Sequence, residues 1–170
     1  MLNAVIYARL PSKGEFDFER CLYIIRKEKG ALSGTFIDLC RSGYTFDRPE
    51  YRRMKESINA KKVDMVVMPS FVQFSRNISE AIKEIESMKE MGIAVFFCDI
   101  GIDSRAIDTT SESFKKILDA ALEAFPFETS GEEDHIEFDL CGSMEHIEEY
   151  MGDFQVVDKS LFDQEDGGDD

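Results

Sequence analysis

The sequence has no tryptophan, two histidines and few cysteines among its 170 residues. The four cysteines are widely spaced and form no CxxC pair: Cys21, Cys40, Cys98 and Cys141. This pattern predicts reduced thiols in a cytoplasmic protein, not a disulfide framework. His135 and His146 lie near Cys141 but match no usual zinc spacing, so we expect no metal site and no other cofactor.

Long apolar runs are also missing. No run approaches the roughly 20 residues that a helix needs to cross a bilayer, so no membrane partner is expected. The first ten residues, MLNAVIYARL, lack a basic leading region and a cleavable small-residue site, which argues against a signal peptide. A hydrophobic content of 43% is nevertheless enough for a real core.

Positive charge is scarce in the last third of the chain. The net charge is −15, and it is unevenly spread: residues 1–105 carry 17 Lys and Arg against 15 Asp and Glu, whereas residues 106–170 carry 3 against 20. We therefore expect a folded domain over 1–125 and an acidic extension over 126–170, beginning at Pro126. Apolar residues favour partial docking of 135–162, and the terminal QEDGGDD is predicted to be disordered.

The first 125 residues alternate between short apolar runs and segments of helical periodicity. Strands are predicted over 4–7, 35–38, 63–68 and 93–98, and helices over 16–29, 49–60, 77–91 and 110–125. Four such strand–helix units predict an α/β fold with three layers, in which a mainly parallel sheet of four to five strands has helices on both faces. The aromatic residues Phe71, Phe74, Phe96 and Phe97 are expected in the core.

One stretch, FIDLCRSGYTFDRPEYRR, is the most specific part of the sequence. A strand ends near Asp38, Ser42-Gly43 predicts a turn, and Pro49 suits the first position of a helix. Arg48 would then lie at the start of that helix. Ligand sites of open α/β sheets lie at such carboxyl ends of strands, so this loop is the candidate site.

Three loops together resemble the catalytic domain of serine site-specific recombinases, the resolvase/invertase family. They are YARLPS, DLCRSGYTFDRPEYRRM and FVQFSRN, with GIDS at 101–104 in a fitting place, and the likeness covers about residues 3–125. The spacing of the central motif is most similar to the large serine recombinases. The resemblance implies DNA as partner, a serine nucleophile that attacks a phosphodiester, and arginines that stabilise the developing charge.

Three positions match the arginines that the resemblance implies: Arg9, Arg48 and Arg76. Asp38 is expected to orient the site, and Ser42 and Gln73 occupy phosphate-binding positions. Alternatively, the arginines are structural or solvated, Ser42 is only a turn residue, and Asp38 only caps a turn.

Two positions depart from the pattern. Pro11 stands where the nucleophilic serine is expected, and Gln73 stands in place of an arginine. Ser12 is a displaced candidate nucleophile, one residue late, which is a shift of about 3.5 Å along an extended chain. Weak or absent cleavage is therefore expected, and whether the chain is an enzyme is left open.

Three functions remain as alternatives. The chain is a recombinase-like domain that still engages DNA, a catalytically silent protein that contacts a recombinase or a second copy of itself, or an acidic DNA mimic with an autoinhibitory extension. Residues 126–170 show one lysine, no arginine and no helix-turn-helix or zinc module, which weakens the expectation of DNA binding.

Overall fold

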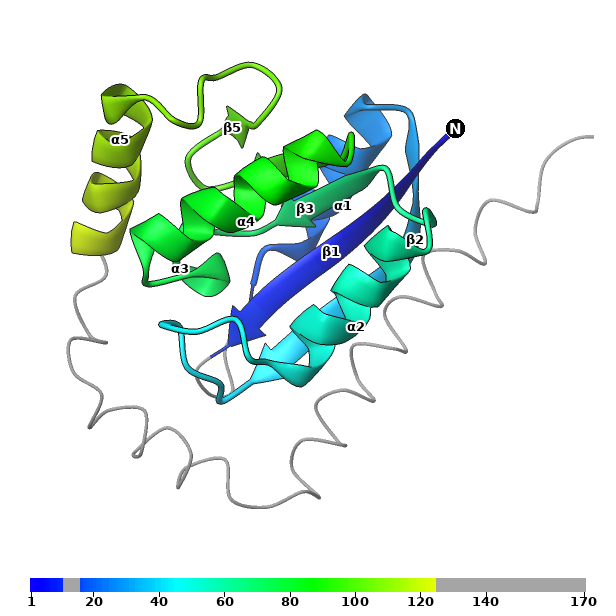
Figure 1. Cartoon of the computed structure of the whole chain (residues 1–170). Coiled ribbons are helices and arrows are strands. Elements are labelled where there is room, and N and C mark those ends of the chain that lie inside the picture. The colour runs from blue at the N-terminus through cyan, green and yellow to red at the C-terminus, as the bar shows by residue number, and fades with distance from the viewer. Residues whose placement is uncertain (11–15, 125–170) are drawn as a thin grey trace, which may run out of the picture.

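Five strands form one sheet in the order β2-β1-β3-β4-β5 (Figure 1). The computed structural model describes residues 1–10 and 16–124. Its elements are β1 (Leu2–Leu10), α1 (Phe18–Lys27), β2 (Gly30–Leu39), α2 (Pro49–Asn59), β3 (Met65–Met68), α3 (Phe71–Phe74), α4 (Ile78–Glu90), β4 (Ala94–Phe97), β5 (Ile102–Asp103) and α5 (Glu112–Glu123). The first four strands in this order are parallel and β5 is antiparallel to β4, which confirms the predicted α/β class.

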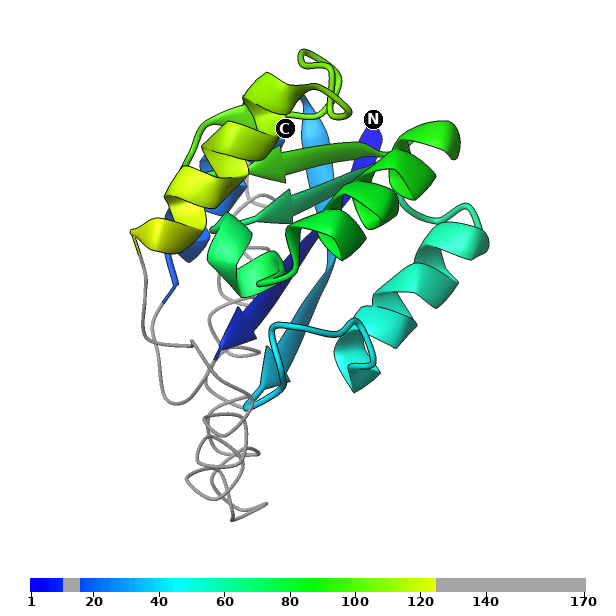
Figure 2. The ribbon, with the colours of Figure 1, turned by 60° about the vertical axis from the view of Figure 1, so that its left-hand side comes forward.

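Alternate side chains of the central strands β1, β3 and β4 supply two separate cores. On one face, strand residues such as Val5, Val66 and Val95 pack with residues of α2, α3, α4 and α5. On the other face, Ile6 and Val67 pack with residues of α1. Figure 1 shows α1 behind the sheet, and Figure 2 shows α2 and α4 together on the other side, to the right of β1. Helices therefore cover both faces, as the continuous apolar strands predict.

The helix that follows the candidate loop begins without a side-chain cap of its own. Arg48 is the N-cap residue of α2 and Pro49 follows it, but the Arg48 side chain makes no capping hydrogen bond to the helix. Instead the Asp38 carboxylate at the end of β2 accepts hydrogen bonds from the backbone N–H groups of Glu50, at 3.0 Å, and Tyr51, at 2.9 Å. A carboxylate at a helix N-terminus satisfies free N–H groups and complements the helix dipole.

Two elements were not predicted. The segment after β3, expected as a loop, contains the single turn of α3, which Ser70 caps through the backbone N–H of Gln73. Its residues Phe71 and Phe74 are fully buried, and the four aromatic residues expected in the core are all found there. The short strand β5 was also missed, because two residues are too few to give a periodic signal.

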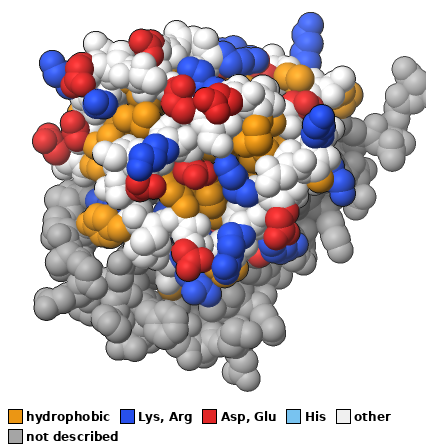
Figure 3. Space-filling model, in the orientation of Figure 1, with side chains coloured by type: hydrophobic (Ala, Val, Ile, Leu, Met, Phe, Trp, Pro, Cys, Tyr) orange, Lys and Arg blue, Asp and Glu red, His pale blue; other side chains and the backbone are white. Residues whose placement is uncertain are grey.

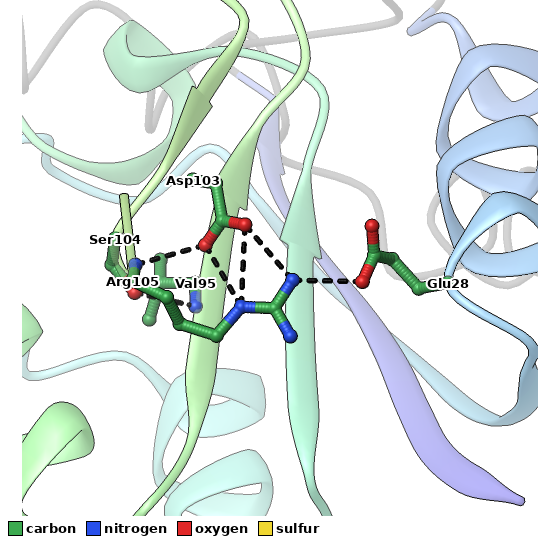
Figure 4. A network of polar contacts seen from close by, with 5 residues as sticks. All are labelled: Glu28, Val95, Asp103, Ser104 and Arg105. Carbon is green, nitrogen blue, oxygen red and sulfur yellow. Dashed lines mark hydrogen bonds and ion pairs between the residues drawn. The ribbon is translucent and has the colours of Figure 1, made fainter. Parts of the chain in front are cut away.

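Strand β5 is fastened to α1 by Arg105, whose guanidinium lies between two carboxylates (Figure 4). Its Nη2 donates to Glu28 at the C-terminal end of α1, at 2.7 Å, and to Asp103 at 2.9 Å. The guanidinium also lies over the ring of Phe96, 5.2 Å from its centroid. Because the group is about half exposed, these ion pairs contribute modestly to stability.

The face shown in Figure 3 carries positive and negative side chains intermingled, with apolar patches between them. Across the described part of this face no broad region of one sign is visible. Within residues 1–10 and 16–124, no helix is long and apolar enough to cross a membrane.

The prediction that the cysteines are reduced thiols is only partly confirmed. Cys21 and Cys98 are free and buried, as predicted for reduced thiols. Cys40 is disulfide-bonded, which contradicts a wholly reduced chain. The predicted extension over 126–170, its docking over 135–162 and its disordered end also lie outside the described residues.

Candidate functional site

The loop between β2 and α2 and the loop after β3 meet at Gly43. The carbonyl oxygen of Gly43 accepts a hydrogen bond from the backbone N–H of Arg76 at 2.7 Å. A methyl group added to Gly43 would lie 2.6 Å from Cγ of Arg76 and 2.8 Å from Nη2 of Arg9. Nη2 of Arg48 donates to the same carbonyl at 3.4 Å. Three arginines that are far apart in the sequence therefore come together around one glycine.

Arg48 is completely buried, and its guanidinium donates to oxygen atoms of the protein. Nε donates to the carbonyl of Ser42 at 2.9 Å. Nη1 donates to the Tyr7 hydroxyl at 2.9 Å and to the carbonyl of Phe74 at 2.8 Å. The cation also lies 4.9 Å from the centre of the Phe46 ring. Arg48 thus binds together β1, the loop before α2 and the end of α3.

Arg9 is also buried, with 1% of its surface exposed. Its Nη1 donates to the carbonyl of Arg41 and its Nη2 to the carbonyl of Val72, each at 3.1 Å. Arg76, by contrast, is partly exposed. The three arginines therefore differ in exposure. Arg9 and Arg48 are buried and connect the loops through hydrogen bonds, whereas Arg76 reaches the surface.

Asp38 reaches Arg48 through Tyr7. The Tyr7 hydroxyl donates to Asp38 at 3.0 Å and accepts from Arg48, so a single OH connects the carboxylate with the guanidinium. Burial, the largest cause, raises the pKa of Tyr7 above its ordinary value, and Arg48 acts in the opposite direction. Tyr7 therefore stays protonated and keeps its role as donor. Asp38 therefore accepts a hydrogen bond from Tyr7 while it caps α2.

Replacing Tyr7 by phenylalanine tests this connection. Tyr7→Phe should lower the free energy of unfolding by about 1–3 kcal/mol, because the buried Asp38 carboxylate loses a donor and Arg48 loses an acceptor. Urea denaturation followed by circular dichroism measures the change. Tyr23→Phe is the matched control, since Tyr23 is 63% exposed and should change stability little. Equal effects of the two substitutions would contradict the connecting role.

Ser42 lies in the loop before α2 and Gln73 on α3, and backbone carbonyls of both segments accept hydrogen bonds from the buried arginines. The Ser42 hydroxyl accepts from the backbone N–H of Tyr44 at 3.1 Å, which is a turn contact. Gln73 lies on α3, and among the described residues its Oε1 is buried without a hydrogen-bond partner. Pro11 and Ser12 fall outside the described residues. No cluster of three metal-ligating side chains occurs within the described part of the chain.

The fold and these loops define an α/β domain with buried arginines at the carboxyl ends of its strands. Residues 4–135 match the family Resolvase, N terminal domain, and the chain belongs to this family. This confirms the family resemblance and the relation to site-specific recombination that it implied. A comparison with curated proteins found no match.

Solved structures show the same fold. The N-terminal catalytic domain of TP901-1 integrase is 20% identical, with a TM-score of 0.56, and the match covers 74% of this chain and 96% of that chain. A resolvase family site-specific recombinase from Streptococcus pneumoniae is 18% identical, with a TM-score of 0.50, and the match covers 92% of this chain and 99% of that chain.

Sequence reasoning missed two residues that contact the arginines of the site, Tyr7 and Gly43. Tyr7 precedes Arg9 by two positions on β1, so strand alternation places both on the same side of the sheet. That spacing was a usable signal. Gly43 was interpreted only as a turn residue, and nothing in the sequence indicates that two guanidinium side chains pack against it.

Proposed function

We propose that this chain is a resolvase-family domain that contacts the DNA backbone without cleaving it efficiently. The observation that carries the proposal is that the Arg48 guanidinium is buried and donates its hydrogen bonds to oxygen atoms of the protein. Its Nε and both hydrogens of Nη1 are directed at protein oxygens within 2.9 Å, and its side chain is buried. A guanidinium stabilises a phosphoryl transition state only when its donors point at the phosphate oxygens.

Two sequence positions support the same proposal. Gln73 carries no charge where the resemblance implies an arginine, and Pro11 carries no hydroxyl where it implies the nucleophile. Loss of one charged donor from such a site costs about 3 kcal/mol or more of transition-state stabilisation. Displacing the hydroxyl by one residue costs further, since a misplacement of about 1 Å lowers rates by about a hundredfold.

Covalent capture tests the absence of cleavage. The full-length chain is incubated with labelled duplexes of randomised sequence and run on a denaturing gel, beside an active serine recombinase on its own site. We expect no covalent protein–DNA band from this chain. A band that disappears in Ser12→Ala would overturn the proposal and make Ser12 the nucleophile. A band that persists in Ser12→Ala would also overturn it and assign another nucleophile.

Restoring the missing charge should strengthen DNA binding. Gln73→Arg is expected to add one phosphate contact beside the partly exposed Arg76, and so to steepen the dependence of log affinity on log salt concentration by about 1. Fluorescence anisotropy with a nonspecific duplex over a salt series measures the slope. Gln73→Leu is the control of similar size and should leave the slope unchanged. Equal slopes for the two variants would count against DNA contact at this site.

A second function is supported by the charge distribution. Residues 106–170 carry 20 acidic and 3 basic side chains, a pattern suited to mimic or repel a phosphate backbone. If this segment is autoinhibitory, a full-length variant with the acidic residues of 127–170 changed to their amides should bind the nonspecific duplex more tightly. Unchanged affinity at low salt would exclude this second function.

A further inference from the structure

Two cysteines lie side by side where α1 packs against the sheet. Cys21 belongs to α1, and Cys98 directly follows β4. Their sulfur atoms are 3.7 Å apart, and the two residues are 0% and 3% exposed. Both belong to the core that α1 forms with the sheet. The 76 residues that separate them in the sequence make this a long-range contact, set by the packing of the helix on the sheet.

The surroundings of the pair exclude a metal site and favour a reactive thiol. Within the described residues no third cysteine, histidine or carboxylate joins the two sulfurs in a group able to hold an ion. The hydrogen bond with Cys21 lowers the pKa of the Cys98 thiol, burial opposes this, and the positive charge of Arg20 adds to the lowering. The same contact and burial raise the pKa of Cys21. Cys98 is also the less buried of the two, at 3% exposed against 0%, so we assign it as the nucleophile of the pair.

We propose that Cys21 and Cys98 form a dithiol modification site that a peroxide oxidises to a disulfide. The Cys98 thiolate attacks one oxygen of hydrogen peroxide, the O–O bond breaks, and sulfenic acid and hydroxide form. The Cys21 sulfur then attacks the Cys98 sulfur, the S–O bond breaks, and the leaving hydroxide takes the Cys21 proton to form water. Peroxide is reduced and the two thiols are oxidised. Peroxide is small enough to enter a core that opens only locally.

The geometry suits this step. A disulfide bond is about 2.05 Å long, so the two sulfurs, 3.7 Å apart, must approach each other by roughly 1.6 Å. The bond would fix α1 to the end of β4.

Peptide mapping tests the proposal on the native full-length chain. Trypsin separates the four cysteines into different peptides: Cys21 in 21–26, Cys40 in 30–41, Cys98 in 90–105 and Cys141 in 117–159. After hydrogen peroxide treatment and alkylation, mass spectrometry should find 21–26 linked to 90–105 as the main peroxide-dependent disulfide product, two hydrogens lighter than the reduced pair. The link should not be the main product in chain that is first fully reduced and then oxidised in denaturant, where all four thiols compete.

Two results would overturn the proposal. One is that 21–26 and 90–105 remain separately alkylated after peroxide treatment. The other is that Cys98 is oxidised beyond sulfenic acid while Cys21 stays free. Cys21→Ser gives a matched check, since its Cys98 should accumulate sulfenic acid, which a dimedone probe traps. The proposal does not rest on DNA binding, so it stands or fails independently of the proposed function.

Discussion

Arg48→Ala is expected to lower the free energy of unfolding by about 3–5 kcal/mol, the loss typical of breaking a buried, hydrogen-bonded charge. The substitution leaves the carbonyls of Ser42 and Phe74 and the Tyr7 hydroxyl without a donor in the core. It also removes the cation that Tyr7 connects to buried Asp38. Arg48→Lys should recover little, because a single ammonium cannot reproduce the planar fork that serves these acceptors.

Chemical denaturation of the two variants and of Arg52→Ala measures this effect. Arg52 is the matched control: it lies on the same helix, its side chain is 63% exposed, and it pairs with exposed Asp47. Its removal should cost less than about 1 kcal/mol. If Arg48→Ala cost no more than Arg52→Ala, the internal role of Arg48 would be wrong.

Gly43→Ala is expected to lower the free energy of unfolding by about 2–3 kcal/mol, as overpacking of a filled site does. The added methyl group would overlap Cγ of Arg76 at 2.6 Å and the buried guanidinium of Arg9 at 2.8 Å. Cγ of Arg76 is near the backbone, so it has little freedom to move. Gly43 is not among the residues with positive φ, so the cost is steric and not conformational.

Gly34→Ala provides the control for the glycine experiment. A methyl group there meets its nearest neighbour, a ring carbon of Phe36, at an ordinary 3.4 Å. Gly34→Ala should therefore leave the midpoint of urea denaturation nearly unchanged, whereas Gly43→Ala shifts it to lower urea. A Gly43→Ala chain as stable as Gly34→Ala would show that the arginines do not pack at this glycine.

The fold was largely predictable because each strand is a continuous apolar run and most helices have clear start signals. Asn77, for example, caps α4 through the backbone N–H of Glu80, as its position suggested. The boundaries were less predictable. Strand β1 extends to Leu10, well beyond the predicted end at Tyr7, because pairing with β2 continues along the whole strand.

The sequence predicted which arginines belong to the site, but not how their side chains are oriented. The three motifs place Arg9, Arg48 and Arg76 at the carboxyl ends of neighbouring strands or in the loops that follow them, and parallel topology brings those ends together. Sequence does not say where a guanidinium points. The resemblance implies that Arg48 faces a phosphate, and the structural alternative was left open; the carbonyls of Ser42 and Phe74 and the Tyr7 hydroxyl accept its hydrogen bonds.

The most direct measurement follows the arginine Nε–Hε groups by nuclear magnetic resonance in the full-length chain, with signals assigned from Arg48→Lys and Arg76→Lys. We predict that Arg48 Hε, which donates to the Ser42 carbonyl at 2.9 Å, exchanges slowly with water and keeps its chemical shift when inorganic phosphate or a nonspecific duplex is added. The signal of Arg76, which is partly exposed, should move. A rapidly exchanging Arg48 Hε whose shift follows the phosphate concentration would contradict the account.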